Sequence, residues 1–281
     1  MAESPRAAGR AGWAEGLRTR TIYGALMAAI AAACILLGDV AFAVLVACCA
    51  VAMASEWTRL SSSGRFGPSG WLAVLVPVAC IALTHLDRTT LALALALAGS
   101  LAALLLARAT SRPVPAWAAA GVLYVALPVV ALVWLRGHDA SGERMFVWLV
   151  LAVAASDTGA FFAGRLVGGP LLAPRISPKK TWAGLGGAVA SSVAVGFAVA
   201  ALDGKAPPAA ALAVAGAVLA VVAQAGDLAE SAFKRHFGAK DASALIPGHG
   251  GMMDRVDGLV AAAACLAAFQ WASAGGLLAW R

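Results

Sequence analysis

The sequence predicts an all-α protein that crosses a membrane about nine times. Of its 281 residues, 62% are hydrophobic and only 12% are charged, whereas soluble domains are about 45–50% apolar and about 25% charged. The apolar residues form long continuous runs, unlike the alternating segments of roughly ten residues that build an outer-membrane barrel. The charged residues gather in short segments between these runs. These observations indicate a polytopic helical membrane protein.

Each apolar run is close to the roughly 20 residues that a helix needs to cross the hydrocarbon core. The predicted spans are 21–37, 39–56, 70–86, 89–107, 116–135, 145–164, 183–202, 208–227 and 256–280. Only Gly38 and Asp39 separate the first two, so one long bent helix is the alternative there. A second apolar run follows the first almost at once, which favours a retained span over a cleaved signal peptide.

Residues 1–20 are basic and polar, and we expect them to form a cytoplasmic tail. We treat 21–281 as a single transmembrane domain with its catalytic part at about 145–281. With the N-terminus inside and nine crossings, sixteen of the 21 Lys and Arg residues lie inside and five outside. This matches the excess of basic residues in cytoplasmic loops. We therefore expect a multi-pass protein of a bacterial-type inner membrane, with the polar segments 165–182 and 228–255 in the cytoplasm.

The basic residues and the cysteines argue against a nucleic-acid-binding protein and against a disulfide or zinc framework. The net charge is +7, but the sequence has no basic stripe with interleaved aromatic residues, so we expect no nucleic-acid partner. All five cysteines lie in apolar runs without a CxxC pair, which predicts neither a disulfide framework nor a zinc site.

The first polar segment and the span before it predict a phosphate site. Asp157 lies within an apolar span, where an ionisable side chain is costly and marks a functional site by default; a structural ion pair is the alternative. Ser177 fits a helix N-cap and Pro178 fits the first helical position. A helix N-terminus favours phosphate, and Lys179 and Lys180 add positive charge there. A basic cluster that only fixes topology is the alternative.

The second polar segment carries acidic residues at helical spacing. Asp227, Glu230, Ser231 and Lys234 lie at i, i+3, i+4 and i+7, so on a helix they share one face. Asp254 and Asp257 then begin the last predicted span, three residues apart. We expect the last four or so spans to surround a polar cavity that opens to the cytoplasm.

Carboxylates that meet phosphate-binding lysines indicate metal and phosphate chemistry. Mg²⁺ prefers a few carboxylates together with substrate phosphates and waters, and it neutralises charge in phosphoryl and nucleotidyl transfer. Asp254 and Asp257 as simple helix N-terminal charge is the alternative. His249 lies between glycines and could be a general base, a phosphate donor or a structural hydrogen-bonding group; the sequence leaves these three open.

The motifs of the second segment give a specific resemblance. Between 231 and 257 the chain reads SAFKR, then KD, then PGHGG, then DRVD. With Asp157 and the run SPKKTW at 177–182, this resembles the phosphatidate cytidylyltransferase (CDP-diacylglycerol synthase) family over about the C-terminal 45% of the chain. One departure is Ala183, where the family often has an acidic residue.

The resemblance implies that CTP and phosphatidic acid react at the lipid bilayer to give CDP-diacylglycerol and pyrophosphate. It also implies Mg²⁺, with K⁺ as a possible monovalent partner, and a possible homodimer. The predicted metal ligands are Asp157, Asp227, Asp254 and Asp257. The predicted catalytic residues are Asp227, Lys234, His249, Asp254 and Asp257. The predicted substrate and phosphate ligands are Ser177, Lys179, Lys180, Thr181, Arg235, Lys240 and Arg255.

Three other functions are weighed against this one. The segment from Asp254 opens like the acidic motif of CDP-alcohol phosphotransferases, but Ala262 replaces the required Arg and no acidic residue follows Asp257, which excludes that family. A CTP-dependent polyprenol or lipid kinase remains an alternative. An ion-coupled transporter is the alternative of another class, although no inverted repeat is evident.

Overall fold

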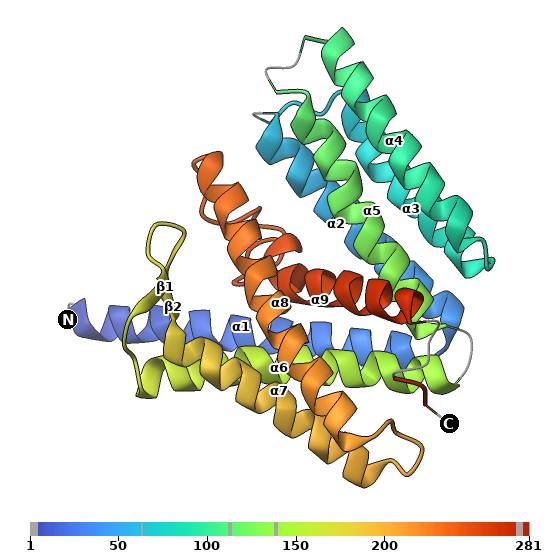
Figure 1. Cartoon of the computed structure of the whole chain (residues 1–281). Helices are drawn as coiled ribbons and strands as arrows, with labels where there is room; N and C mark the ends of the chain where they lie inside the picture. The colour runs from blue at the N-terminus through green and yellow to red at the C-terminus, as the bar shows by residue number, and fades with distance from the viewer. Residues whose placement is uncertain (1–4, 63, 112–113, 138–139, 274–277, 281) are drawn as a thin grey trace.

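The computed structural model of this chain describes residues 5–280 except 63, 112–113, 138–139 and 274–277. Within these residues it contains nine α-helices and one small β-hairpin (Figure 1). The elements are α1 (Pro5–Leu36), α2 (Asp39–Ser61), α3 (Pro68–His85), α4 (Thr89–Ala109), α5 (Ala116–Arg136), α6 (Ala140–Leu166), β1 (Leu171–Ala173), β2 (Ser177–Thr181), α7 (Trp182–Leu202), α8 (Ala209–His236) and α9 (Met253–Ala272). Among the described residues, the seven helices α2 to α8 are long and apolar enough to cross a membrane. The predicted class, an all-α polytopic membrane protein, is confirmed.

The structure revises several boundaries of the predicted elements. The first two spans are separate helices, because the chain turns at Gly38 with a φ of 105°. Helix α1 begins at Pro5, so the predicted tail is largely helical, and its apolar part, Thr21–Leu36, is shorter than the seven long spans. Helix α8 continues to His236, so residues 228–236 are helical and not part of a loop.

The last predicted span differs most from its prediction. Helix α9 ends at Ala272 rather than near 280, and it is not one of the seven long apolar helices. The acidic residues that begin α9 lower its apolar character.

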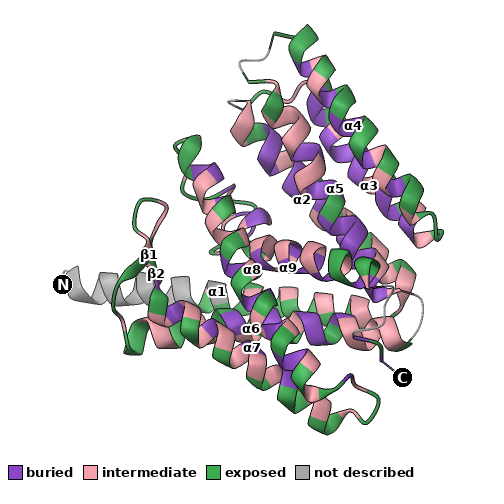
Figure 2. Ribbon diagram, viewed as in Figure 1, coloured by how far each residue is buried: buried purple, intermediate pink, exposed green. Residues whose placement is uncertain are grey.

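Helix α9 joins two groups of helices. Helices α2 to α5 pack against one another in one group, and α6, α7 and α8 form the other. Helix α9 contacts α8 and α6 on one side and α5 and α2 on the other, and it crosses between the groups (Figure 1). Buried residues concentrate where α2, α3 and α5 face one another (Figure 2). The start of α9 is therefore held between the N-terminal and C-terminal halves of the chain.

The end of the molecule that we predicted to lie outside is fixed by a buried arginine. Arg136, at the end of α5, is 4% exposed. Its guanidinium lies 3.4 Å from carboxylate oxygens of Asp39 and Glu143 and donates to the carbonyl of Ile35. One side chain thus ties the α1–α2 turn to α5 and α6, far along the helices from the second polar segment.

Helices α6 and α7 approach each other through glycines. A Cβ placed on Gly187 would lie 2.4 Å from the Cβ of Ala163 and 2.5 Å from the carbonyl oxygen of Gly159. Real Cβ atoms do not approach so closely, so a larger residue there must push the helices apart.

We expect Gly187→Ala to lower the free energy of unfolding by about 1–3 kcal/mol, the usual range for overpacking. The matched control is Gly186→Ala on the same helix, where a Cβ would meet nothing within 4 Å and alanine favours the helix. Thermal unfolding in detergent measures both variants. Equal midpoints for the two would contradict the close helix approach.

Candidate active site

The hairpin between α6 and α7 positions the two lysines differently from the sequence prediction. Ser177 and Pro178 were predicted to begin a helix, but they lie in strand β2, which pairs antiparallel with β1. That prediction is wrong, because the helix begins at Trp182, four residues after the predicted start at Pro178. Thr181 is the N-cap of α7 and its hydroxyl accepts a hydrogen bond of 3.0 Å from the amide of Gly184.

The strand separates the two lysines, because successive side chains of a strand point to opposite faces. Lys179 is exposed, whereas Lys180 is partly buried. The ammonium of Lys180 lies 2.6 Å from a carboxylate oxygen of Asp227 and donates to the side-chain oxygen of Gln224 at 2.9 Å. Lys180 is therefore the lysine that the fold brings to the predicted acidic residues.

Gln224 connects this pair to helix α6. Its amide nitrogen donates to Asp157 at 3.3 Å while its oxygen accepts from Lys180. Ser231, one turn after Asp227, donates to the Asp227 carboxylate at 3.3 Å. Residues from α6, the hairpin and α8 thus meet in one polar cluster.

The close crossing of α8 and α9 adds Asp257 to this cluster. A Cβ on Gly226 would lie 2.5 Å from the Cβ of Ala261 and 2.9 Å from the carbonyl oxygen of Asp257. Only glycine at this position allows the two backbones to come so near. The carboxylate of Asp257 accepts a hydrogen bond of 2.7 Å from the amide of Gly258.

A second polar cluster lies where α8 ends and α9 begins. Lys234 pairs with Glu230 at 2.6 Å and also with Asp254. The other oxygen of Asp254 accepts hydrogen bonds from the amides of Gly251 and Ala242, at 2.7 and 2.9 Å. Asp254 thus binds both the end of α8 and the segment that connects α8 to α9.

These contacts also decide the charge of Asp254. Burial alone favours its neutral form, but the hydrogen bonds from Lys234, Gly251 and Ala242 hold the pKa of Asp254 below its ordinary value. Asp254 is therefore ionised at neutral pH and serves as the partner of Lys234.

We expect Lys234→Met to lower the free energy of unfolding by about 3–5 kcal/mol, because it leaves buried carboxylates without their cation. The Glu230 side chain is fully buried and that of Lys234 is 10% exposed, so water cannot replace the lost partner. The control is Arg235→Met, since Arg235 is exposed and only donates to the carbonyl of Ala239. Thermal unfolding midpoints that drop equally in both variants would contradict this role of Lys234.

The carboxylates of the first cluster fit a divalent cation better than Asp254 does. Asp157, Asp227 and Asp257 place three carboxyl groups near one lysine, and carboxylates are the ligands that Mg²⁺ prefers. Both oxygens of Asp254 are already engaged. Within the described part of the chain, no three His, Cys, Asp or Glu side chains are gathered tightly enough to form a complete metal centre. Substrate phosphates would have to supply the remaining ligands.

Three of the other predicted phosphate ligands are surface residues. Arg235, Lys240 and Arg255 are exposed. His249 is partly exposed, and its ring lies next to α1, since a Cβ on Gly24 would come within 3.4 Å of its Nε2. Its Nδ1 lies 3.4 Å from the carbonyl oxygen of Pro247 in the same turn.

Sequence reasoning assigned no site role to two residues that organise the site. Gln224 bridges Lys180 and Asp157, and Glu56 of α2 binds the start of α9. A polar side chain inside an apolar span is the signal that could have identified both.

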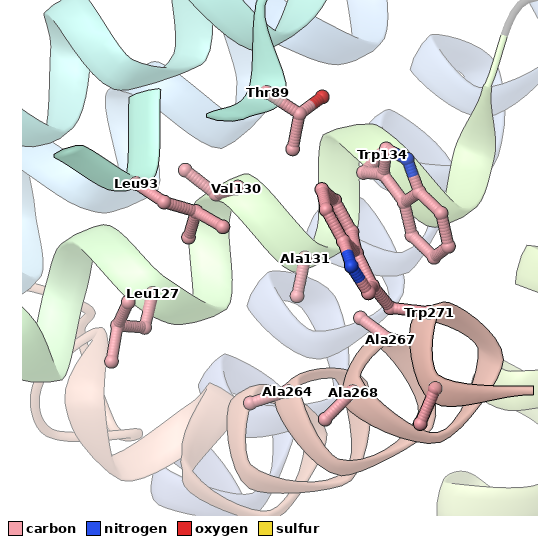
Figure 3. Close-up of a pocket in the computed structure, with 11 residues that line it drawn as sticks. Thr89, Leu93, Leu127, Val130, Ala131, Trp134, Ala264, Ala267, Ala268 and Trp271 are labelled. Atoms are coloured by element: carbon pink, nitrogen blue, oxygen red, sulfur yellow. The ribbon is translucent and has the colours of Figure 1, made fainter. Parts of the chain in front are cut away.

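A pocket elsewhere in the molecule is lined almost entirely by apolar side chains. It has a volume of about 420 Å³ and lies between α4, α5 and α9 (Figure 3). Trp134 and Trp271 flank it, with ring centroids 5.8 Å apart. Thr89, at the first position of α4, contributes a hydroxyl, and no charged side chain lines the pocket. The two polar clusters described above lie instead on the hairpin, α6, α8 and α9.

Comparison with known proteins identifies the family of this chain. Residues 18–272 match the model of the cytidylyltransferase family. A phosphatidate cytidylyltransferase of Brucella suis is 41% identical over 256 residues, which is 90% of this chain and 93% of the relative. A phosphatidate cytidylyltransferase of Pseudomonas aeruginosa is 37% identical over 230 residues, 79% of this chain and 84% of the relative. The chain therefore belongs to the cytidylyltransferase family.

Proposed function

We propose that this chain is a phosphatidate cytidylyltransferase of phospholipid biosynthesis. It transfers the cytidylyl group of CTP to phosphatidic acid in the bilayer and produces CDP-diacylglycerol and pyrophosphate. The observation that carries this proposal is the ion pair of Lys180 with Asp227, which Gln224 links to Asp157, in a chain whose relatives, matched over most of its length, bear this name.

The reaction asks the protein to position two phosphates and to offset their charge. A phosphate oxygen of phosphatidic acid attacks the α-phosphorus of CTP, a new P–O bond forms, and the bond to the β-phosphate breaks with release of pyrophosphate. Lys180 reaches into the acidic cluster and is placed to bind a phosphate oxygen. Lys179 and Arg235 are exposed and would attract the anionic substrates from the cytoplasm.

We further propose that Asp227 and Asp257, with Asp157 beside them, hold Mg²⁺. When bound, the ion would neutralise charge on the triphosphate. Gln224 keeps Lys180 and Asp157 in place by hydrogen bonds to both. Asp254, Lys234 and Glu230 fix the α8–α9 connection in this proposal, so Asp254 acts as a positioning residue.

The family resemblance supports three further parts of the proposal. They are an inner-membrane location with the N-terminus and the hairpin in the cytoplasm, a homodimer, and K⁺ beside Mg²⁺. The distribution of basic residues supports the orientation independently.

Labelled CTP distinguishes the proposed reaction from its alternatives. With phosphatidic acid and Mg²⁺, purified protein should move label from α-³²P CTP into the lipid, while label from γ-³²P CTP stays in water as pyrophosphate. Transfer of the γ-label to a polyprenol would establish the kinase instead. Absence of both transfers from folded protein would contradict the proposal and favour a transporter. Removal of divalent ions by EDTA should stop the transfer and added Mg²⁺ should restore it.

A further inference from the structure

The N-terminal half of the chain contributes a side chain to the site region through Glu56. This residue lies on α2 and is 4% exposed. One of its carboxylate oxygens accepts hydrogen bonds from the Ser243 hydroxyl at 2.6 Å and from the amide of Met252 at 2.8 Å. The other accepts from the amide of Met253 at 2.8 Å. Both carboxylate oxygens of Glu56 therefore bind a segment that lies nearly 200 residues away in the sequence.

These contacts give hydrogen-bond acceptors to the backbone N–H groups at the start of α9. The first N–H groups of a helix have no partner within it, and a carboxylate there also interacts favourably with the helix dipole. Helix α9 begins at Met253 and its own N-cap residue makes no side-chain capping bond. Glu56 therefore supplies the cap from another helix.

The loop before α9 is shaped to admit the carboxylate. A Cβ on Gly251 would lie 2.7 Å from the Oε1 of Glu56 and 2.9 Å from the Cβ of Ala242. The amide of Gly251 itself donates to Asp254. Glycine at 251 thus lets Glu56 and Asp254 both reach the same short stretch of backbone.

The neighbour of Glu56 fixes α2 against α8. The ring of Trp57 stacks on Phe233 with centroids 3.8 Å apart and planes 12° apart, and its indole N–H donates to the carbonyl of Trp117 at 2.8 Å. Phe233 directly precedes Lys234. Adjacent residues of α2 therefore hold the end of α8 and the start of α9 together.

We infer that Glu56 is a positioning residue for cytidylyl transfer, because it fixes the first turn of α9 and with it the placement of Asp257. This inference rests on the proposed function of Asp257. It predicts that Glu56 affects turnover and metal use more than it affects CTP binding.

The test is Glu56→Gln, which keeps the shape of the side chain but replaces one acceptor oxygen by an N–H₂ group that faces a backbone donor. We expect kcat per folded protein to fall about 10- to 100-fold, the usual effect of changing an outer partner of a metal site. The KM for CTP should change little, and the Mg²⁺ concentration for half-maximal rate should rise. Hydrogen exchange at the amides of Met252 and Met253 should become faster.

The control is Glu143→Gln, which removes an acidic partner of Arg136 at the other end of the helices. A role in stability alone would leave kcat per folded protein and the Mg²⁺ dependence equal in the two variants, and that result would overturn the inference. If Glu56→Gln does not fold, Gly251→Ala displaces the same carboxylate without changing its charge and must show the same kinetic pattern. Failure of the proposed function would appear differently, as absent lipid labelling by the wild type.

Discussion

Replacing Asp227 by Asn is expected to reduce cytidylyl transfer about 10²- to 10³-fold, the range seen when one electrostatic contact to the reacting group is removed. Asp227 pairs with Lys180 at 2.6 Å, and the preceding Gly226 lies against the backbone of Asp257 at the α8–α9 crossing. Asn keeps the size of the side chain but removes the charge that would hold Mg²⁺ and orient Lys180. Initial rates of lipid labelling from α-³²P CTP measure the loss.

The matched control for this variant is Ser231→Ala. Ser231 only donates one hydrogen bond of 3.3 Å to the Asp227 carboxylate, so its loss leaves the charge in place and should cost less than about tenfold. Unchanged labelling in Asp227→Asn, at equal amounts of folded protein, would remove Asp227 from the proposed site.

Replacing Lys180 by Met is expected to reduce transfer by a similar factor, about 10²- to 10³-fold. The ammonium of Lys180 is the cation that the structure places among Asp157, Asp227 and Gln224. Met retains most of the aliphatic length but cannot bind phosphate. The rate should fall at saturating CTP as well as at low CTP, because the charge is needed while the phosphates react.

The neighbouring lysine provides the comparison. Lys179 lies in the same strand but is exposed, so Lys179→Met should cost clearly less than Lys180→Met and should mainly raise the KM for CTP. The same rates in both variants would contradict the strand geometry and would restore the sequence prediction that the two lysines act together.

The helical part of the site was predictable because its pattern is local. Asp227, Glu230, Ser231 and Lys234 were placed on one face by their spacing, and the structure shows Ser231 bound to Asp227 and Lys234 to Glu230. Such contacts depend only on the helical repeat. The spacing did not show that α8 extends to His236, because nothing local distinguishes a helical from a loop continuation there.

The hairpin was not predictable in the same way. Ser177 followed by Pro178 satisfies the local rules for a helix start, but β2 is defined by its pairing with β1, which a local rule does not detect. The true cap is Thr181. The consequence for function is large, because a strand separates Lys179 from Lys180 and a helix start would not.

Glu56 and Gln224 lay beyond sequence reasoning for a related reason. Each is a polar residue in an apolar span, which marks it as unusual, but its partner is set by packing between distant elements. Glu56 meets a loop near residue 250, and Gln224 meets the hairpin and α6. The family motifs lie in the C-terminal part of the chain, so they contain no information on α2.

The most direct test of the central claim is lipid labelling by wild type, Asp257→Asn and Glu143→Gln, measured together with α-³²P CTP, phosphatidic acid and Mg²⁺. We expect labelling by the wild type and by Glu143→Gln, whose change lies at the opposite end of the helices, and almost none by Asp257→Asn. Labelling by folded Asp257→Asn at the wild-type rate would contradict the carboxylate site at the crossing of α8 and α9.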